Sequence, residues 1–214
     1  MNRGDWLLTA HVVVFALWFG SDLATFSLSR RVVNPTQAAR PVIAGAMMSI
    51  EVVARLCLPL TLGLGVASAE ERGWIDIGAW AAIVMLGCLV WAVEVWCIHR
   101  GQTRLVPVDL VLRSLVAIGT WVVAIGSLVD DGFLPTRWLG VKMLCFAVIV
   151  SSGIAIRFVL RPFSAAFGQI VASGSTPELE ARLMGSIRRA QPFVVVIWLA
   201  LLTAATMAVA QPAL

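Results

Sequence analysis

The stretch "WLGVKMLCFAVIVSSGIAIRFVL", Trp138–Leu160, contains one lysine and one arginine among residues that are otherwise apolar or small. A transmembrane helix needs about 20 predominantly apolar residues, because each residue rises about 1.5 Å and the hydrocarbon core is about 30 Å thick. The stretch is long enough to cross that core, so it predicts a membrane span.

Five more stretches of this kind are present: Trp6–Leu28, Val42–Ala67, Trp74–Ile98, Val106–Val129 and Pro192–Ala210. Of the 214 residues, 60% are hydrophobic and 13% are charged, whereas a soluble domain carries about a quarter charged residues. Strand-like alternation is absent, which argues against a barrel. The first stretch lacks the basic start and the cleavage site of a signal peptide. The sequence therefore predicts an all-α polytopic membrane protein, a bundle of six transmembrane helices.

The loops between these spans alternate between basic and acidic. Those after the first, third and fifth spans carry the arginines Arg30, Arg31, Arg40, Arg100, Arg104, Arg157, Arg161, Arg182, Arg188 and Arg189. The other two carry Glu70, Glu71, Asp76, Asp130 and Asp131, beside Arg72 and Arg137. The positive-inside rule then places both termini outside the cytoplasm, in a bacterial cytoplasmic (inner) membrane. The net charge of +4 indicates contact with anionic membrane lipid and not with nucleic acid.

Residues 1–214 form one predicted transmembrane domain, with a cytoplasmic or interfacial segment at 161–191. Within that segment, Ser175 or Thr176 can cap a helix that begins at Pro177, and the first turn contains Glu178 and Glu180. A polar cap, a proline and acidic residues are typical of a helix N-terminus. We therefore expect a short helix there, before the last span.

Charged residues inside the spans are the first candidates for function, because each is costly in hydrocarbon. Glu51 and Arg55 are four residues apart, as are Asp109 and Arg113, so each pair shares a helix face. Internal ion pairing is the simpler interpretation of both. Arg55 lies deep in its span and could instead bind an anion or a propionate, so we take Arg55 and Glu51 as candidate catalytic residues.

Asp22 and Glu94 have no such partner on their own helices. With the predicted orientation, both lie towards the cytoplasmic end, near Asp109 and Arg113. Each either snorkels to the interface or takes part in a polar site there.

His11 and Lys142 are predicted at similar depth on the outer side of the membrane. Histidine is the commonest metal ligand, and lysine, unlike arginine, can lose its proton when buried. Lys142 is the single lysine of the chain, which suggests proton chemistry or an anion contact. The alternatives are a hydrogen-bonded core histidine and a lysine that snorkels to the headgroups.

The cysteines and methionines give weaker evidence of a functional site. Cys57, Cys88, Cys97 and Cys145 all fall in predicted spans without C-x-x-C spacing, so they indicate neither disulfides nor zinc. Methionine and cysteine are soft ligands that suit copper(I). The pairs Met47–Met48 and Met143–Cys145 are candidates for it, although such residues usually serve packing.

Three short motifs resemble HemJ-type membrane proteins. The first span has His11, Trp18 and Gly20 before the basic exit "LSRRVV", the fifth opens "WLGVKMLCF", and the last is entered through "RRAQPFVVVIW". CopD-type copper-resistance membrane proteins are similar in the first two of these motifs. The resemblance covers under half of the chain.

A HemJ-like protein would bind haem b and oxidise protoporphyrinogen. The resemblance then implies that His11 is a haem or metal ligand, that Trp18 and Lys142 help to bind the cofactor, and that Lys142 is catalytic. The other histidine, His99, is predicted at a cytoplasmic helix end, and Ser151 and Ser152 stand where the family has a second histidine. His11 would therefore be the one histidine ligand of the haem iron. The second ligand would be a methionine, or there would be no second protein ligand.

Two other functions stay open at this point. One is a small permease or copper-handling protein of CopD-like type, and the other is a non-catalytic membrane subunit or scaffold. Across these three possible functions, the expected partners are membrane lipid, a porphyrin-like or small-ion substrate, and further copies of the chain or other membrane subunits.

Overall fold

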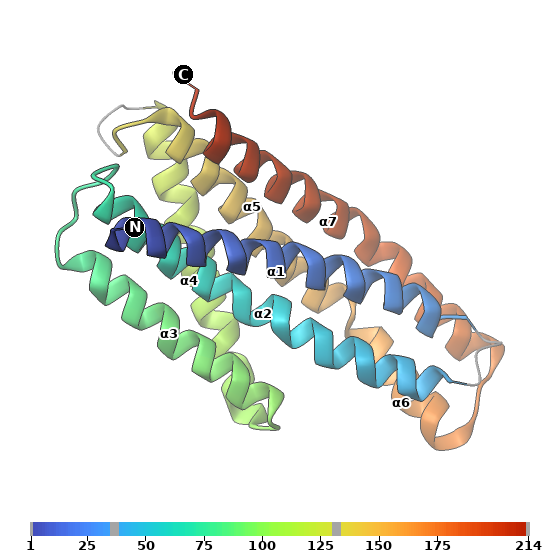
Figure 1. Ribbon diagram of the computed structural model, residues 1–214. Coiled ribbons are helices and arrows are strands. Elements are labelled where there is room, and N and C mark those ends of the chain that lie inside the picture. The colour runs from blue at the N-terminus through green and yellow to red at the C-terminus, as the bar shows by residue number, and fades with distance from the viewer. Residues whose placement is uncertain (1, 35–38, 130–133, 213–214) are drawn as a thin grey trace.

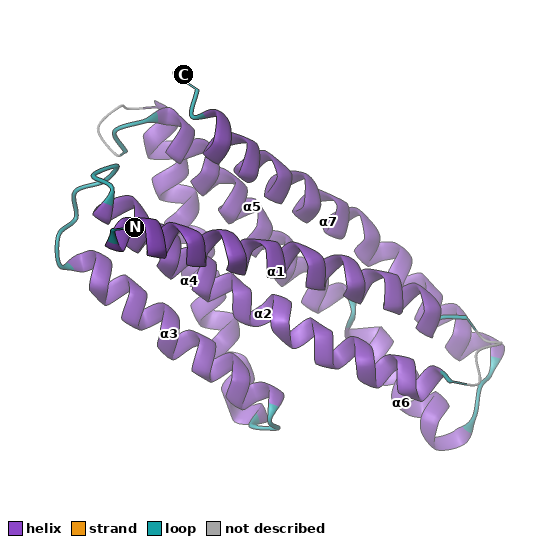
Figure 2. Cartoon of the chain, in the orientation of Figure 1, coloured by secondary structure: helices purple, strands orange, loops and turns teal. Residues whose placement is uncertain are grey.

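The computed structural model describes residues 2–34, 39–129 and 134–212. Over these ranges it consists of helices and connecting loops (Figures 1 and 2), with the order α1(Arg3–Val32), α2(Arg40–Glu71), α3(Trp80–His99), η1(Thr103–Leu105), α4(Val106–Val129), α5(Arg137–Val159), α6(Arg161–Ser173) and α7(Pro177–Ala210). Six helices are long and apolar enough to cross a membrane. The prediction of an all-α polytopic membrane bundle is confirmed; Asp130 and Asp131 lie outside the described residues.

The spans form two three-helix units. In the first unit α2 packs along both α1 and α3, and in the second unit α5 packs along both α4 and α7. The two central helices, α2 and α5, are the most buried of the six. The units meet at two seams with few backbone contacts, α1 against α7 and α3 against α4. Large side chains bridge the interior, as where the Trp18 and Phe146 rings meet edge to face with centroids 6.3 Å apart.

Both chain ends lie at one end of the bundle and α6 lies at the other (Figure 1). We call these the terminal half and the α6 half. That the terminal half faces outward, and that α6 rests in the interface, stay predictions of the loop charges.

α7 differs from expectation, because the predicted short helix and the predicted last span form one helix of 34 residues. It begins where the sequence indicated, with the Thr176 side chain accepting a hydrogen bond from the Leu179 N–H. It then continues through Pro192. Packing explains this continuity, since Leu179, Leu183 and Ile187 are buried in one cluster with Phe163 and other side chains of α6 and α2. That burial offsets the hydrogen bond that a proline removes.

A buried ion pair ties the start of α7 to the start of α2. Arg40 donates from Nη1 and Nη2 to the two carboxylate oxygens of Glu180, at 2.6 and 3.1 Å. Ser175 Oγ also donates to Glu180. Arg40, expected to be a loop charge, is thus buried at the first position of a helix.

The third span begins later than predicted, at Trp80 and not at Trp74. The preceding loop is held by Glu70, whose carboxylate accepts hydrogen bonds from the backbone N–H groups of Ile77 and Gly78. Gly78 has φ +55°, which suits glycine. Trp74 lies in this loop, outside α3, and packs edge to face on Trp138, with ring centroids 5.2 Å apart.

Candidate functional site

His11 and Lys142 lie within electrostatic range of each other in the terminal half, although they are 131 residues apart in the chain. His11 projects from α1 and Lys142 from α5, and they are close enough for the lysine charge to act on the imidazole. The Lys142 ammonium nitrogen also lies 5.6 Å from the centre of the Trp138 ring, in cation–π range. That the two residues have similar depth in the membrane stays a prediction.

The His11 imidazole rests against a glycine of α2. A Cβ atom added at Gly65 would lie 3.0 Å from His11 Cε1, so the ring occupies the space that a side chain there would need. Among the described residues, His11 Nδ1 and Thr61 Oγ1 are buried without hydrogen-bond partners. Buried polar atoms are normally satisfied. Nδ1 lies on the Gly65 side of the ring, 3.3 Å from such a Cβ, and the imidazole also has a backbone hydrogen bond with Thr61.

Trp18, predicted to help bind a cofactor, lies two helical turns further along α1. Its side chain is only 4% exposed and packs against Phe146 in the main hydrophobic core. The structure therefore gives Trp18 a packing contact, and its role towards a cofactor stays a prediction.

Glu51 and Arg55 form the predicted ion pair, with Arg55 Nη2 2.6 Å from Glu51 Oε1. They do not join His11 and Lys142. Arg55 precedes Gly65 by ten residues on α2, or about 15 Å along the helix axis. The candidate site residues therefore fall into two groups, one in each half of the bundle.

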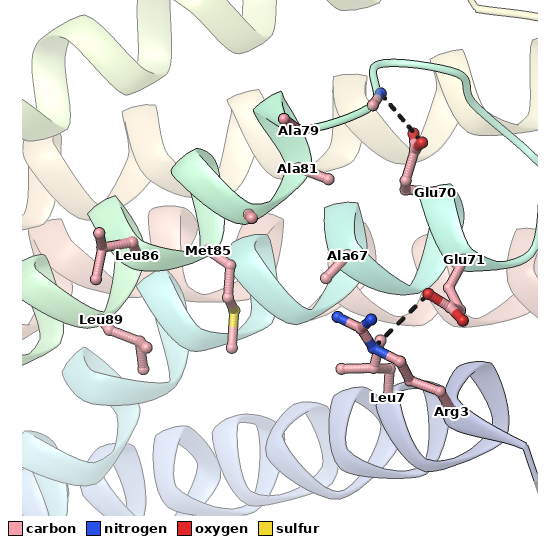
Figure 3. Close-up of a pocket in the computed structure, with 12 residues that line it drawn as sticks. Arg3, Leu7, Ala67, Glu70, Glu71, Ala79, Ala81, Met85, Leu86 and Leu89 are labelled. Atoms are coloured by element: carbon pink, nitrogen blue, oxygen red, sulfur yellow. Dashed lines mark hydrogen bonds and ion pairs between the residues drawn. The ribbon is translucent and has the colours of Figure 1, made fainter.

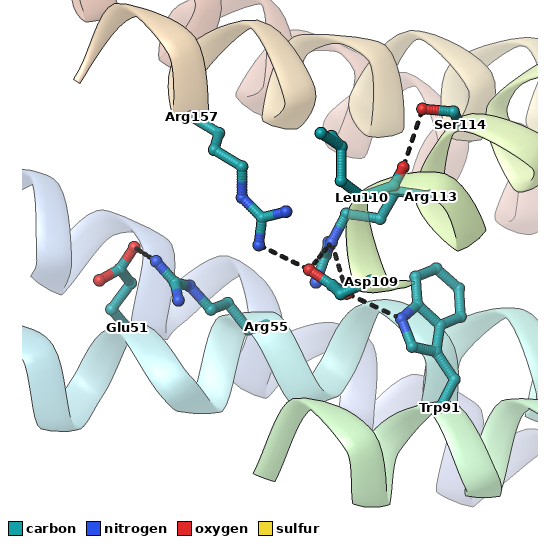
Figure 4. Close-up of polar contacts among 8 residues, drawn as sticks. All are labelled: Glu51, Arg55, Trp91, Asp109, Leu110, Arg113, Ser114 and Arg157. Atoms are coloured by element: carbon teal, nitrogen blue, oxygen red, sulfur yellow. Dashed lines mark hydrogen bonds and ion pairs between the residues drawn. The ribbon is translucent and has the colours of Figure 1, made fainter. Parts of the chain in front are cut away.

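The group in the α6 half is centred on Asp109, whose side chain is 1% exposed (Figure 4). Arg113 Nε lies 3.0 Å from both carboxylate oxygens of Asp109, which confirms the predicted pair. Arg157 of α5 donates to Oδ2 at 2.6 Å, and the Trp91 indole of α3 donates to Oδ1 at 3.1 Å. One buried carboxylate thus accepts hydrogen bonds from three helices.

Arg157 and Trp91 are the members of this cluster that sequence reasoning missed. Arg157 was expected among the loop charges, but it stands inside α5. Its position in the last turn of an apolar span was a usable signal, because a charge there needs a partner or an interface. Nothing in the sequence indicated a partner for the Trp91 indole.

Asp22 and Glu94 also lie in the α6 half. Glu94 is close enough to Asp109 and Arg113 to interact with both, as predicted. Asp22 accepts a hydrogen bond of 2.7 Å from the Trp198 indole of α7 and lies within electrostatic range of Glu51. Every span thus contributes a charged or indole side chain to this region.

A pocket of about 450 Å³ opens at the terminal end of the first unit, between α1, α2 and α3 (Figure 3). Its walls are apolar, with Leu7, Ala67, Met85 and Leu89, and its rim carries the ion pair Arg3–Glu71 at 3.7 Å. Neither His11 nor Lys142 lines it. Arg3, Glu70 and Glu71 are the charged residues that line it, and Arg3 and Glu71 are paired with each other.

Metal ligands do not cluster. Over the described ranges there is no group of three or more His, Cys, Asp or Glu side chains that could hold an ion. The four cysteines are free, and His99 packs against Trp96 at the end of α3.

Comparisons with protein-family models, with curated proteins and with solved structures find no match to this chain. The HemJ- and CopD-like interpretation consequently rests on its short motifs and on the positions of the residues in them.

Proposed function

We propose that the chain is a haem-binding redox protein of HemJ-like type, in a bacterial cytoplasmic membrane, with its site at His11 and Lys142. The proximity of these two side chains, from α1 and α5, is the observation that supports it most. The multi-pass membrane character is carried by the six apolar spans.

The residues present fit a haem in two respects. His11 has a buried ring nitrogen without a partner among the described residues, and its ring lies in a cradle that only glycine at position 65 leaves open. A neutral imidazole is a common axial ligand of haem iron. Lys142 supplies an ammonium for a haem propionate or for a carboxylate of a porphyrin-type substrate.

A bound haem would supply one-electron redox chemistry. The tasks of the chain's own residues are then distinct. His11 would hold the iron, and Lys142 would bind a carboxylate and give up or take a proton at Nζ. An ammonium within about 4 Å of a carboxylate is worth roughly 4 kcal/mol at an effective dielectric near 20, before desolvation.

The visible absorption spectrum of the detergent-purified protein, expressed with haem supplementation, tests this function. A Soret band is expected in the wild type and in His99→Ala, which removes the other histidine. His11→Ala should lose the band, and Gly65→Ala should shift or weaken it, because the added methyl displaces the imidazole. A wild-type protein without a Soret band, or His11→Ala with an unchanged one, would refute the proposal.

A small permease of CopD-like type is a second candidate function. The observation that favours it is the division into two three-helix units that meet at sparse seams, since many carriers bind their substrates between such units. Metal analysis of the purified protein separates the two candidate functions: copper without a Soret band would favour this candidate.

A further inference from the structure

We propose that the pocket between α1, α2 and α3 binds one membrane phospholipid whose headgroup carries a phosphate and a primary ammonium. One acyl chain lies along the apolar walls, the phosphate meets Arg3 and the ammonium meets Glu71. This is a specific site, beyond the general contact of the spans with lipid. Neither His11 nor Lys142 lines the pocket, so the site does not depend on haem binding.

The apolar walls extend through about one leaflet of a bilayer. Most of the lining comes from one face of α3 and its N-cap, from Ala79 at the mouth to Leu89 at the deep end. About ten helical residues span about 15 Å, which is half of a hydrocarbon core of roughly 30 Å. Leu7 of α1 lines the other side, and the small side chain of Ala67 lines the pocket from α2 (Figure 3). The pocket thus has the depth that one acyl chain of a leaflet needs.

The mouth of the pocket lies at the level expected for lipid headgroups. Trp6 of α1 and Trp80 of α3 adjoin lining residues in the sequence, and they are 62% and 67% exposed. Exposed tryptophans at the ends of spans are typical of the membrane–water interface. Arg3 and Glu71 lie at the same end of their helices. A ligand that fits both regions is therefore an amphiphile of the leaflet, with its polar group at this mouth.

The charged groups at the mouth suit a headgroup with both signs of charge. Arg3 Nε lies 3.7 Å from Glu71 Oε2, which is too long for a hydrogen bond, and the Arg3 side chain is 80% exposed. Such an exposed pair is weak, so both groups can accept a ligand in exchange for each other. Glu70 adds a second carboxylate, held in place by the N–H groups of Ile77 and Gly78.

The balance of charge distinguishes between headgroups. The neighbouring Arg72 is already bound to Asp5 at 2.9 Å, so the lining contributes one guanidinium, from Arg3, and two carboxylates, from Glu70 and Glu71. An anionic headgroup would add to this negative charge, whereas a phosphate with an ammonium leaves it unchanged. A primary ammonium also donates hydrogen bonds to a carboxylate, which a quaternary ammonium cannot do.

Thermal unfolding of the detergent-purified full chain tests the site. Phosphatidylethanolamine, phosphatidylcholine and phosphatidylglycerol with the same acyl chains are titrated in mixed micelles, beside soluble glycerophosphoethanolamine. A lipid tail is as apolar in the bilayer as in the pocket, so the headgroup decides the affinity. Phosphatidylethanolamine should raise the melting temperature saturably, as a ligand of the folded state does, with about tenfold higher affinity than the other two lipids.

The other outcomes of this titration would overturn the proposal. Equal rises with the three lipids, or no rise with any of them, would mean unspecific contact with lipid. A preference for phosphatidylglycerol or phosphatidylcholine would contradict the assigned headgroup. A rise with glycerophosphoethanolamine as large as that with the complete lipid would mean a soluble ligand.

Variants at the mouth separate the two charges of the headgroup. Glu71→Gln should lower the affinity for phosphatidylethanolamine about tenfold and leave that for phosphatidylcholine unchanged. Arg3→Gln should weaken both, and Arg3→Lys should restore most of the loss. Arg188→Gln, at an exposed arginine of α7 outside the pocket, is the matched control. An unchanged lipid preference in Glu71→Gln would refute the contact with the ammonium.

A variant of the wall tests the acyl chain. Ala82 is exposed and lines the pocket, so Ala82→Leu fills space there without altering the charged groups. It should weaken the binding of phosphatidylethanolamine about tenfold. Ala16→Leu, at an exposed position of α1 outside the lining, is the control. Equal affinities in these two variants would show that no chain occupies the pocket.

Discussion

Trp198 of α7 donates its indole N–H to Asp22 of α1 at 2.7 Å, across one seam between the two units. Trp91 of α3 donates to Asp109 of α4 at 3.1 Å across the other seam. In each case a tryptophan on the third helix of one unit meets an aspartate on the first helix of the other. Both bonds lie in the α6 half, so that half is fastened at both seams by polar contacts, of which the Trp91–Asp109 bond is buried and the Trp198–Asp22 bond is partly buried.

Trp198→Phe should therefore loosen the α1–α7 seam. Phenylalanine keeps the edge-to-face contact with Phe26, whose ring centroid lies 5.2 Å from that of Trp198, but it loses the hydrogen bond to Asp22. We expect a loss of about 1 kcal/mol in unfolding free energy, typical of a hydrogen bond between membrane helices. Denaturant unfolding in mild detergent measures it. Trp96→Phe, at a half-exposed site on α3, is the control and should have little effect.

Asp109→Asn should be among the most damaging substitutions. It leaves Arg113 and Arg157 without their common counter-ion in a buried position, and an uncompensated buried charge costs about 3–5 kcal/mol. The same unfolding assay detects this loss. Asp76→Asn, on an exposed loop, should change stability by about 0.5 kcal/mol or less. Similar values for the two variants would mean that the Asp109 cluster is not buried in the folded protein.

Substitution by alanine should have opposite effects on stability at two glycines of the first unit. A Cβ at Gly63 would lie 2.9 Å from Cys88 Cβ, so Gly63→Ala forces α2 and α3 apart and should cost about 1–3 kcal/mol. Gly87, on α3, has nothing within 4 Å of such a Cβ. Gly87→Ala should instead stabilise its helix by about 0.5–1 kcal/mol. Melting temperatures that move in the same direction would contradict this packing of α2 on α3.

Lys142→Arg should keep the fold and the charge but impair function, because arginine stays protonated where lysine can release its proton. Lys142→Met should also lose affinity for any carboxylate ligand. Complementation of a bacterial strain unable to oxidise protoporphyrinogen is the measurement, with protein level in the membrane as the control. Wild-type growth with both variants would reduce Lys142 to an interfacial anchor.

Membrane topology gives a further prediction. Because the basic loops all connect to the α6 half, a reporter fused after Leu214 should be active only outside the cytoplasm. A reporter inserted in the loop at 174–176 should be active inside. Cytoplasmic activity of the C-terminal fusion would reverse the assigned orientation.

Features that depend on residues close together in the sequence could be predicted. The pairs Glu51–Arg55 and Asp109–Arg113 followed from the helical repeat, because residues four apart share a face whatever the surroundings. The spans followed from length and composition. The similar depth of His11 and Lys142 was predicted in the same way, because four antiparallel connections give their two helices the same direction. That the two side chains lie within electrostatic range of each other depends on packing.

Contacts set by packing could not be predicted in this way. Which helices face each other decides that Arg157 and Trp91 reach Asp109, and that Trp198 reaches Asp22. The separation of Arg55 from His11 has the same origin. The continuity of α7 through Pro192 was also hidden, because the local cost of a proline is visible in the sequence but the burial of Leu183 and Ile187 against α6 is not.

The length and continuity of α7 have a mechanical consequence. A helix of 34 residues is about 51 Å long, so its first turns, before Pro192, project past the apolar span. The fork of Arg40 on Glu180 couples those turns to the first residue of α2. A tilt of about 5° around the middle of such a rod displaces each end by roughly 2 Å. A protein or lipid that pushes on α6 therefore moves α7 and α2 together, and along α7 the movement passes Pro192 before it reaches the terminal half.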